Sequence, residues 1–407
     1  MTYTIEKVTT LIGARRYGDK DTNIGFILTD SRSLCFPEET LFFALKSERN
    51  DGHNYIPELY RRGVRNFVVT NVPKGYASDY PEANFLKVVN TLEALQRLAE
   101  RHRDEFNIPI VGITGSNGKT MVKEWLYQLL SPSMFVTRSP RSYNSQIGVP
   151  LSVWLMNEQT EVGVFEAGIS QPGEMLALRD IIQPTIAVLT YLGSAHQENF
   201  ESLEAKCREK IILFHDAETI VYNGDDEIVS KVVGEYHDYK GEKLYWSQKD
   251  AEAPFFIKNI EKKNDLTIVT YIYKGEEDSY SLPFIDEASV TNSIISAVVS
   301  RKLGLSAEDV DKRMSLLEPV AMRLEVKEGQ HGCTLINDSY NSDINSLDIA
   351  LDFMSRRPDH KGRRHTLILS DIFQSGETPA DLYKEVSDLC RKRGVVKFIG
   401  VGPQLYE

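Results

Sequence analysis

The stretch Gly112-Ile113-Thr114-Gly115-Ser116-Asn117-Gly118-Lys119-Thr120 decides most of what this sequence predicts. It follows an apolar run, 108–111, and precedes a helix-like stretch, 121–130. Glycines let backbone N–H groups approach an anion closely, and the start of the next helix adds partial positive charge. Lys119 can reach the β- and γ-phosphates of a nucleotide, and the Thr120 hydroxyl suits Mg²⁺. The stretch predicts a loop that binds a nucleoside triphosphate through Gly115, Ser116, Asn117, Gly118, Lys119 and Thr120.

This loop departs from the usual phosphate-loop pattern at one position. That pattern has a glycine five residues before the Gly-Lys-Thr, and Ile113 stands there in this chain. The alternative interpretation is a glycine turn between a strand and a helix, with no bound phosphate.

Composition limits the class of protein. The chain has 407 residues, 41% of them hydrophobic and 26% charged, which is ordinary for a globular protein of two to four domains. We expect no membrane span, because no apolar run approaches ~18–20 residues, and no signal peptide at the N-terminus. The net charge of −12 argues against nucleic-acid binding. Four scattered cysteines fit reduced thiols, so we expect a cytoplasmic protein.

Alternating strand and helix patterns predict an α/β fold with three domains, at residues 1–106, 107–318 and 319–407. The middle domain is expected to have a mostly parallel sheet covered on both faces. Its expected strands are 108–113, 135–138, 162–167, 185–190, 219–223 and 243–246. Strands 255–260, 266–273 and 279–282 are expected to run antiparallel, with a helix near 290–303.

The third domain begins again with strands and alternates with helices. Its expected strands are 324–328, 333–338, 366–369 and 396–401, and its expected helices are 345–354 and 380–393. It is expected to end just after a strand, without a closing helix.

Two candidate metal ligands follow predicted strands of the middle domain. Glu166 ends a buried-type strand, at the sheet edge where open α/β folds bind ligands. A carboxylate there can hold Mg²⁺ on phosphates, and the alternative is a solvated acid at a strand end. His196 follows the next strand, and the alternative for this lone loop histidine is a surface position.

Lys210 is unusual because of where it falls on its predicted helix. At about 100° per residue it lies only ~20° from Leu203, inside an apolar stripe, whereas Lys206 lies ~60° away, nearer the edge. A lysine on a buried stripe is desolvated, so its pKa is expected to fall. A neutral amine can react with CO₂ to give a carbamate, which resembles a carboxylate ligand. The alternative is a lysine whose ammonium reaches past the stripe to water.

Two charged residues open the third domain. Arg323 could close over a γ-phosphate and neutralise developing charge. Asp338 lies at a strand end and could accept hydrogen bonds from ribose hydroxyls. For each residue alone, a surface charge is the alternative.

Together these motifs resemble the Mur ligase family, the ATP-dependent amide ligases of peptidoglycan precursor synthesis. The likeness follows the family order over nearly the whole chain. Its motifs are the loop 114–120, Asn144-Ser145-Gln146-Ile147-Gly148-Val149-Pro150, Glu166-Ala167-Gly168, Gly193-x-Ala195-His196, Asn223-Gly224-Asp225-Asp226 and Asp338-Ser339-Tyr340-Asn341. Lys210 falls where the family carries a carbamylated lysine.

The resemblance implies an N-terminal UDP-binding domain, a central ATPase and a Rossmann-like C-terminal domain. Within the family, the likeness points to the member that joins D-alanyl-D-alanine to UDP-N-acetylmuramoyl-tripeptide through an acyl phosphate. The supporting segments are Asp30-Ser31-Arg32, Phe43-Ala44-Leu45-Lys46, Asp51-Gly52-His53 and Gln171-Pro172-Gly173-Glu174-Met175.

The implied cofactors are ATP and two Mg²⁺ ions, with Lys210 carbamylated. Lys119, His196, Lys210 and Arg323 would act in catalysis, and Thr120, Glu166, His196 and Lys210 would bind metal. Asn292 would contact adenine, Asp338 the ribose and Arg323 the γ-phosphate. Ser31, Arg32, Lys46 and Asn144 would bind the substrate.

The sequence also departs from the family pattern. Ala288-Ser289 replace a His-Asn pair before the adenine-side Asn292, and Asp343-Ile344 replace Asn-Pro. The third domain ends earlier than is usual, so we expect a truncated domain. The N-terminal third resembles forms fused to a C-terminal alanine racemase.

Other functions remain open from the sequence. Another Mur-type ligase, or a folylpolyglutamate-type ligase, would share the ATP loop and the lysine. A P-loop NTPase switch would hydrolyse nucleotide without joining it to any acceptor.

Overall fold

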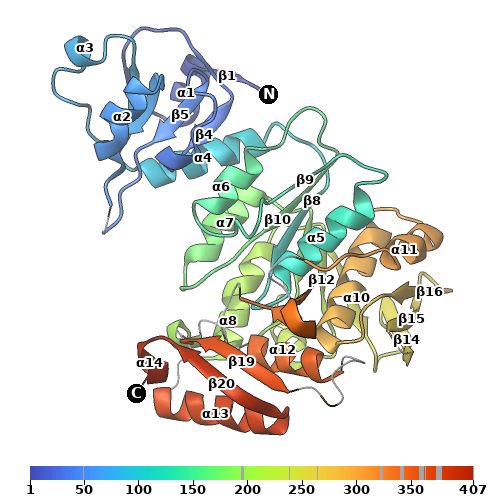
Figure 1. The fold of residues 1–407 in the computed structure, drawn as a ribbon. Coiled ribbons are helices and arrows are strands. Elements are labelled where there is room, and N and C mark those ends of the chain that lie inside the picture. The colour runs from blue at the N-terminus through green and yellow to red at the C-terminus, as the bar shows by residue number, and fades with distance from the viewer. Residues whose placement is uncertain are drawn as a thin grey trace.

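The computed structural model describes residues 1–406 except positions 49, 194–196, 238, 264, 321–323, 340–342, 357–361, 363 and 373–377. The described residues form three α/β regions that follow one another along the chain (Figure 1). We call them the N-terminal region (3–87), the middle region (110–314) and the C-terminal region (324–406). The domain boundaries predicted at 106/107 and 318/319 fall between their sheets and remain a proposal.

The N-terminal region is built on a sheet with the strand order β2-β7-β6-β5-β4. Strands β4 to β7 pair in parallel, and β2 is antiparallel to β7. The strands of this region are β1 (Tyr3–Thr4), β2 (Arg15–Tyr17), β3 (Asn23–Ile24), β4 (Phe26–Leu28), β5 (Thr40–Phe43), β6 (Asn66–Val69) and β7 (Asn84–Lys87). Its helical segments are α1 (Ile5–Leu11), η1 (Ser31–Ser33), η2 (Gly52–Tyr55), α2 (Ile56–Arg61) and α3 (Tyr76–Asp79).

Helix α4 (Thr91–Arg103) joins the N-terminal and middle regions. Its Leu98 packs in the core of the N-terminal region, whereas Ala99 packs in a core of the middle region. Arg103 Nε donates to the carbonyl of Ile182, 2.9 Å away in the middle region. The helix was expected to lie in the N-terminal domain, and its contacts show that it is shared.

The middle region is a sheet with the order β16-β15-β14-β13-β12-β11-β8-β10-β9. Strands β8 to β14 pair in parallel, and β15 and β16 extend the sheet antiparallel. The strands are β8 (Ile110–Thr114), β9 (Val136–Arg138), β10 (Val162–Glu166), β11 (Ile186–Leu189), β12 (Thr219–Asn223), β13 (Glu242–Ser247), β14 (Phe255–Lys263), β15 (Leu266–Tyr273) and β16 (Glu276–Leu282). This mostly parallel sheet confirms the predicted fold class.

Helices cover both faces of the middle sheet (Figure 1). One face packs on α5 (Lys119–Leu130), α10 (Glu287–Lys302) and α11 (Ala307–Met314). The other packs on α6 (Gly148–Val153), α7 (Glu174–Ile182), α8 (Leu203–Lys210), η4 (Ile211–Phe214) and α9 (Glu227–Gly234). Helices cover both faces of β8 and β10, so every residue in these two strands is buried. Functional side chains can therefore lie only at the edge of the sheet where these strands end.

The C-terminal region has two small sheets and a core of its own. Strands β17 (Glu325–Glu328) and β18 (Thr334–Asn337) pair antiparallel, and β19 (His365–Ser370) and β20 (Val395–Val401) pair in parallel. The helices are α12 (Ile344–Arg356), α13 (Pro379–Lys392) and α14 (Pro403–Tyr406). Its core joins Leu347 and Leu351 of α12 to Leu382 and Val386 of α13.

The expected strand bounds of the middle sheet hold within three residues, and one expectation about the C-terminal region is wrong. A short helix, α14, follows the last strand, where no closing helix was expected. Strands β14, β15 and β16 run antiparallel to one another, as expected, and β14 also pairs in parallel with β13. Among the described residues, no helix is long and apolar enough to cross a membrane.

Candidate active site

A cavity of about 670 Å³ lies at the carboxyl edge of the middle sheet. Its walls come from the glycine loop, the segments after β9 and β10, the start of α10, and the C-terminal region. Predicted site residues that line it are Gly115, Ser116, Asn117, Gly118, Lys119, Thr120, Asn144, Lys210, Asn292 and Asp338. Residues far apart in the sequence therefore meet in one place.

The glycines of the loop are required by its packing. A Cβ on Gly115 would lie 2.0 Å from Thr190 Oγ1, and the backbone φ there is +145°. A Cβ on Gly118 would lie 2.5 Å from Asn292 Oδ1, and Gly118 has a left-handed φ of +86°. Either side chain would need atoms to move and would strain the backbone. The loop is therefore packed closely against β11 and α10.

Hydrogen bonds fix this loop to the residues after β11. The N–H of Ser116 donates to the carbonyl of Tyr191 at 2.6 Å, and the N–H of Gly193 donates to Ser116 Oγ at 2.9 Å. Lys119 Nζ folds back over the loop and donates to the carbonyl of Gly115 at 2.8 Å. An ammonium held above a glycine loop at a helix N-terminus can meet a phosphate without rearrangement of the fold.

The structure excludes the alternative interpretation of Glu166, which was a solvated acid at a strand end. Its carboxylate is fully buried at the end of β10, and its N–H donates to Ser139 Oγ. Thr120 Oγ1 donates to Glu166 Oε2 at 3.1 Å, and Ser142 Oγ lies 2.9 Å from Thr120 Oγ1. Glu166 Oε1 accepts no hydrogen bond from the described residues. A buried carboxylate beside a hydroxyl on the phosphate loop fits a magnesium ligand set.

Lys123 is a functional candidate that the sequence interpretation missed. It lies one turn beyond Thr120 on α5, fully buried, and its Nζ is 3.1 Å from Glu166 Oε1. The two groups form an ion pair without the geometry of a hydrogen bond. A signal was present, because Lys123 lies seven residues before buried Leu130 and so only ~20° from it around the helix. The same spacing argument identified Lys210.

Lys210 is buried as predicted, at the end of α8, and its Nζ donates to the carbonyl of Gly115 at 3.3 Å. Burial lowers the pKa of Lys210 well below its ordinary value, and the neighbouring ammonium groups of Lys119 and Lys206 lower it further. Gly115 thus accepts from both Lys119 and Lys210. This burial excludes the alternative interpretation, in which the ammonium of Lys210 reaches past the apolar stripe to water.

Lys206 was expected near the edge of the apolar stripe, and this was wrong. Its side chain is buried, and its Nζ donates to the carbonyl of Gly193. The segment after β11 covers this flank of α8, so burial extends beyond the apolar stripe. Burial is the main reason that the pKa of Lys206 falls to about 8.

Two predicted catalytic residues, His196 and Arg323, lie outside the described residues. Their proximity to the site therefore stays a prediction. Among the residues that the structure does describe, no group of three or more His, Cys, Asp or Glu side chains is placed to hold a metal ion.

The nucleoside end of the cavity is formed by α10 and the C-terminal region. Asn292 is buried on α10, and its Nδ2 contacts Met121 Sδ at 3.6 Å. Asp338 follows β18, and its Oδ1 accepts from the N–H of Leu324 at 3.2 Å. Asp343, which departs from the family pattern, accepts from the N–H of Ser346 and so begins α12.

Asn144 links the cavity to the segment that follows β10. Its carbonyl accepts from the N–H of Gly168 at 2.8 Å, and a Cβ on Gly168 would lie 2.8 Å from Asn144 Cγ. Gln146 Nε2 donates to the carbonyl of Glu174, and Gln96 of α4 donates to Gln146 Oε1. This wall of the cavity is thereby tied to the helix shared with the N-terminal region.

The other predicted substrate residues lie in the N-terminal region, away from the described cavity lining. Arg32 is exposed beside Asp30, and hydrogen bonds from Arg32 lower the pKa of Asp30 to about 2. Ser31 stands between them at the start of η1. The structure does not bring these two residues, or Lys46, to the phosphate loop.

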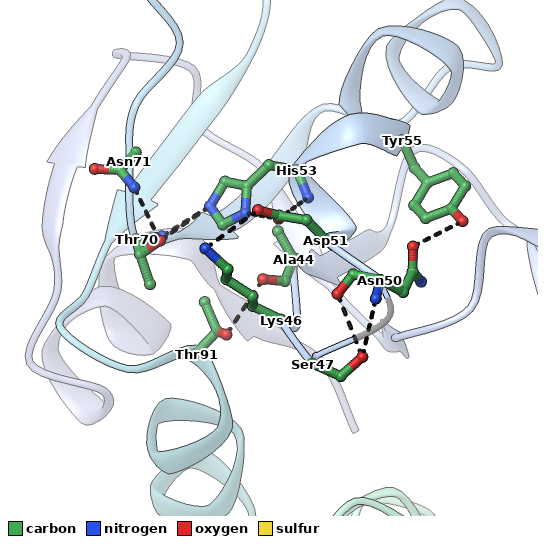
Figure 2. A network of polar contacts seen from close by, with 10 residues as sticks. All are labelled: Ala44, Lys46, Ser47, Asn50, Asp51, His53, Tyr55, Thr70, Asn71 and Thr91. Atoms are coloured by element: carbon green, nitrogen blue, oxygen red, sulfur yellow. Dashed lines mark hydrogen bonds and ion pairs between the residues drawn. The ribbon is translucent and has the colours of Figure 1, made fainter.

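Lys46 belongs to a polar network around Asp51 and His53 (Figure 2). Lys46 Nζ lies 3.8 Å from Asp51 Oδ2, and His53 Nδ1 lies 2.6 Å from Asp51 Oδ1. The N–H of Thr70 donates to His53 Nε2 at 3.1 Å, so the proton of the neutral ring is on Nδ1 and points to Asp51. Hydrogen bonds thus hold Asp51 and His53 in place, and the exposed side chain of Lys46 lies beside them.

Comparisons with known proteins agree with this arrangement. A family model described as the Mur ligase middle domain matches residues 113–300. A UDP-N-acetylmuramoyl-tripeptide–D-alanyl-D-alanine ligase from Bacillus subtilis (strain 168) is 28% identical over 382 residues, which are 90% of this chain and 77% of the relative.

Solved structures have the same fold. MurF from Acinetobacter baumannii has a TM-score of 0.86 at 22% identity, covering 99% of this chain and 86% of that chain. MurF ligase from Thermotoga maritima, solved in complex with ADP, has a TM-score of 0.76 at 23% identity, covering 96% and 88%. With its phosphate loop, parallel sheet and three α/β regions, this chain has the fold of these Mur ligases, and its residues 113–300 match the Mur ligase middle domain.

Proposed function

We propose that this chain is an ATP-dependent amide ligase that joins D-alanyl-D-alanine to UDP-N-acetylmuramoyl-tripeptide in peptidoglycan precursor synthesis. Its relative from Bacillus subtilis carries the name of that ligase. The observation that carries the proposal is one cavity that joins the phosphate loop to Asn144, Lys210, Asn292 and Asp338. In this proposal the three regions act as domains 1–106, 107–318 and 319–407, and the protein works in the cytoplasm, where ATP is supplied.

The proposed chemistry needs no nucleophile from the protein. The terminal carboxylate of the tripeptide attacks the γ-phosphorus of ATP, which gives an acyl phosphate and ADP. The amine of D-alanyl-D-alanine then attacks the acyl carbon, and phosphate leaves with one of the former carboxylate oxygens. The protein positions the reactants and neutralises charge, the terms that dominate phosphoryl transfer. Lys119 and the loop N–H groups, 115–120, would hold the β- and γ-phosphates.

Two Mg²⁺ ions would neutralise charge on the phosphates and the acyl phosphate. Thr120 and Glu166 would hold the first, because the buried Oε1 of Glu166 lacks a hydrogen bond. His196 and carbamylated Lys210 would hold the second. These assignments rest on the family likeness and on the chemistry of the side chains.

Lys210 suits carbamylation for two reasons. Its amine is buried, so the neutral form that reacts with CO₂ is favoured. The carbamate would then be an anion close to the ammonium groups of Lys119 and Lys206, which would stabilise it. Incubation with ¹³C-labelled CO₂ should give a carbamate signal by NMR that Lys210→Ala removes.

The remaining roles concern the two ends of the substrates. Asn292 would contact adenine and Asp338 the ribose, and Arg323 would reach the γ-phosphate when the C-terminal region closes. Ser31, Arg32 and Lys46 would face the UDP end of the precursor, on the N-terminal region. The likeness of the chain to forms fused to an alanine racemase stays a prediction.

A substrate-omission assay tests the proposal. Phosphate release and product mass are measured with ATP, UDP-N-acetylmuramoyl-tripeptide and D-alanyl-D-alanine, each omitted in turn. We expect the amide product only when all three are present. Product from a folate and glutamate would favour a folylpolyglutamate-type ligase, and phosphate release without any acceptor would favour an NTPase switch.

A further inference from the structure

The buried ammonium of Lys123 contacts three elements at once. It lies 3.1 Å from Glu166 Oε1 of β10 and 3.0 Å from Glu124 Oε1 of its own helix. It also donates to the carbonyl of Arg141, in the segment between β9 and α6. Lys123 and Glu166 are both fully buried. A cation in this position holds the phosphate-loop helix, strand β10 and the 139–145 segment together.

The backbone at Arg141 supports a specific role for this contact. Arg141 has a left-handed φ of +50°, which is costly for a residue with a side chain. Such a conformation persists only where the surroundings hold it, and the hydrogen bond from Lys123 does so. The next residue, Ser142, reaches Thr120 Oγ1 at 2.9 Å. The strained turn thus places a second hydroxyl beside the candidate metal ligands.

The charges around this contact balance without any metal. The carboxylate of Glu166 pairs with Lys123, and that of Glu124 pairs with both Lys123 and Arg138, whose Nε is 3.0 Å away. Two carboxylates therefore face two cations. A divalent cation that enters beside Glu166 would therefore meet a neutral cluster. A single neutralised carboxylate attracts such an ion weakly.

We propose that Lys123 is a positioning residue that makes metal binding at Thr120 and Glu166 depend on the nucleotide. The ammonium serves as the resident counter-ion of Glu166 and fixes its orientation. The phosphates of ATP then supply the negative charge that the cluster lacks, so metal enters with the nucleotide. This inference rests on the proposed function, because it assumes that the loop binds a magnesium–nucleotide complex.

The inference predicts a gain of metal binding when the lysine charge is removed. In Lys123→Met the carboxylate of Glu166 stays buried without its counter-ion, so a divalent cation should bind it in place of the ammonium. Mn²⁺ binding to the nucleotide-free protein is measured by electron paramagnetic resonance. We expect its affinity to rise at least tenfold over the parent protein. Lys123→Met/Glu166→Gln should return it to the parent value.

The same titration with a non-hydrolysable ATP analogue, AMP-PNP, completes the test. In the parent protein AMP-PNP should raise the Mn²⁺ affinity strongly, and in Lys123→Met that increase should shrink at least tenfold. Lys231→Met is the matched control, because it removes an exposed lysine that pairs with Glu204 on the surface. It should leave both affinities within twofold. Lys123→Gln, which keeps a donor for the Arg141 carbonyl, provides the same measurement if Lys123→Met does not fold.

Two results would overturn the inference. In the first, the nucleotide-free forms of both Lys123 variants bind Mn²⁺ no more tightly than the parent protein does. The ion pair between Lys123 and Glu166 would then have a structural role only. A gain that persists in Lys123→Met/Glu166→Gln would show that the metal binds elsewhere. Failure of the proposed function looks different, because it shows in the substrate-omission assay as phosphate release without the amide product. A parent protein that binds no Mn²⁺ even with AMP-PNP would contradict the magnesium–nucleotide site on which both proposals depend.

Discussion

The middle region meets its two neighbours in different ways. Towards the N-terminal region the contact is a packed core, in which His102 Nε2 donates to the carbonyl of Met156 and Trp154 Nε1 donates to the carbonyl of Gly25. Towards the C-terminal region the described contact is a cavity, with Asp338 on the far wall from the phosphate loop. The first junction is closed by packed side chains, whereas the second encloses space that a ligand could enter.

This difference suggests how the site divides its work. Groups on the middle wall of the cavity are already hydrogen-bonded, so they would act as a preformed phosphate site. Groups on the C-terminal wall would contribute when that region closes on the nucleotide. Changes to the middle wall should therefore affect the chemical step, and changes to the far wall should affect nucleotide affinity.

Removing the loop lysine should have the largest effect. Lys119→Ala deletes the ammonium above the glycine loop, where the γ-phosphate would lose charge neutralisation in the transition state. We expect kcat to fall by about 10³-fold or more, as measured by phosphate release with both substrates present. Turnover within tenfold of the parent would show that the loop does not hold the reacting phosphate.

The N-terminal junction should respond to acid. Burial lowers the pKa of His102 to about 4, so the folded state binds fewer protons than the unfolded state between that pH and about 6.5. Stability is therefore complete above pH 6.5 and falls as the pH drops towards 4, by about 3 kcal/mol at most. Urea unfolding at a series of pH values measures it.

A matched pair of histidine variants separates this contribution from general acid denaturation. His102→Gln should flatten the pH dependence between 4 and 6.5, whereas His215→Gln, at an exposed histidine, should leave it in place. Equal slopes in the two variants would contradict a role for His102. The groups that face His102 are Tyr3, Glu105, Lys7 and the N-terminal amine.

Removal of Lys210, which we propose is carbamylated, should reduce turnover on the order of 10²-fold, less than loss of Lys119, because the phosphate loop stays intact. Acetate or formate should restore part of the activity of Lys210→Ala, since a small carboxylate can take the place of the carbamate. Lys206→Ala removes a buried lysine one turn away and should not be rescued. If neither acid rescues a folded Lys210→Ala, carbamylation is excluded.

A substitution on the C-terminal wall of the cavity should have the smallest effect on the steady-state kinetics. Asp338→Ala is expected to raise the KM for ATP by about tenfold, from loss of hydrogen bonds to a ribose, with kcat changed by less than threefold. Steady-state kinetics with ATP varied would check this. A fall in kcat at unchanged KM would mean that the C-terminal wall takes part in the chemical step.

The sequence predicted the parts of the molecule whose physics is local. The glycine loop, the buried strands and the position of Lys210 follow from spacing and periodicity along one element. Lys206 was misjudged, because a segment distant in sequence covers its helix beyond the apolar stripe. Lys123 was overlooked although the same spacing identifies it, and its contact with Arg141 depends on a strained turn that no sequence pattern marks.

Labelled oxygen provides the most direct test of the central claim, that a carboxylate is activated as an acyl phosphate at this cavity. UDP-N-acetylmuramoyl-tripeptide carrying ¹⁸O in its terminal carboxylate is incubated with ATP, D-alanyl-D-alanine and the protein. If the carboxylate is activated as an acyl phosphate, each phosphate released carries one ¹⁸O atom and one amide forms per phosphate. Phosphate without ¹⁸O, in the presence of amide product or without it, would contradict the account.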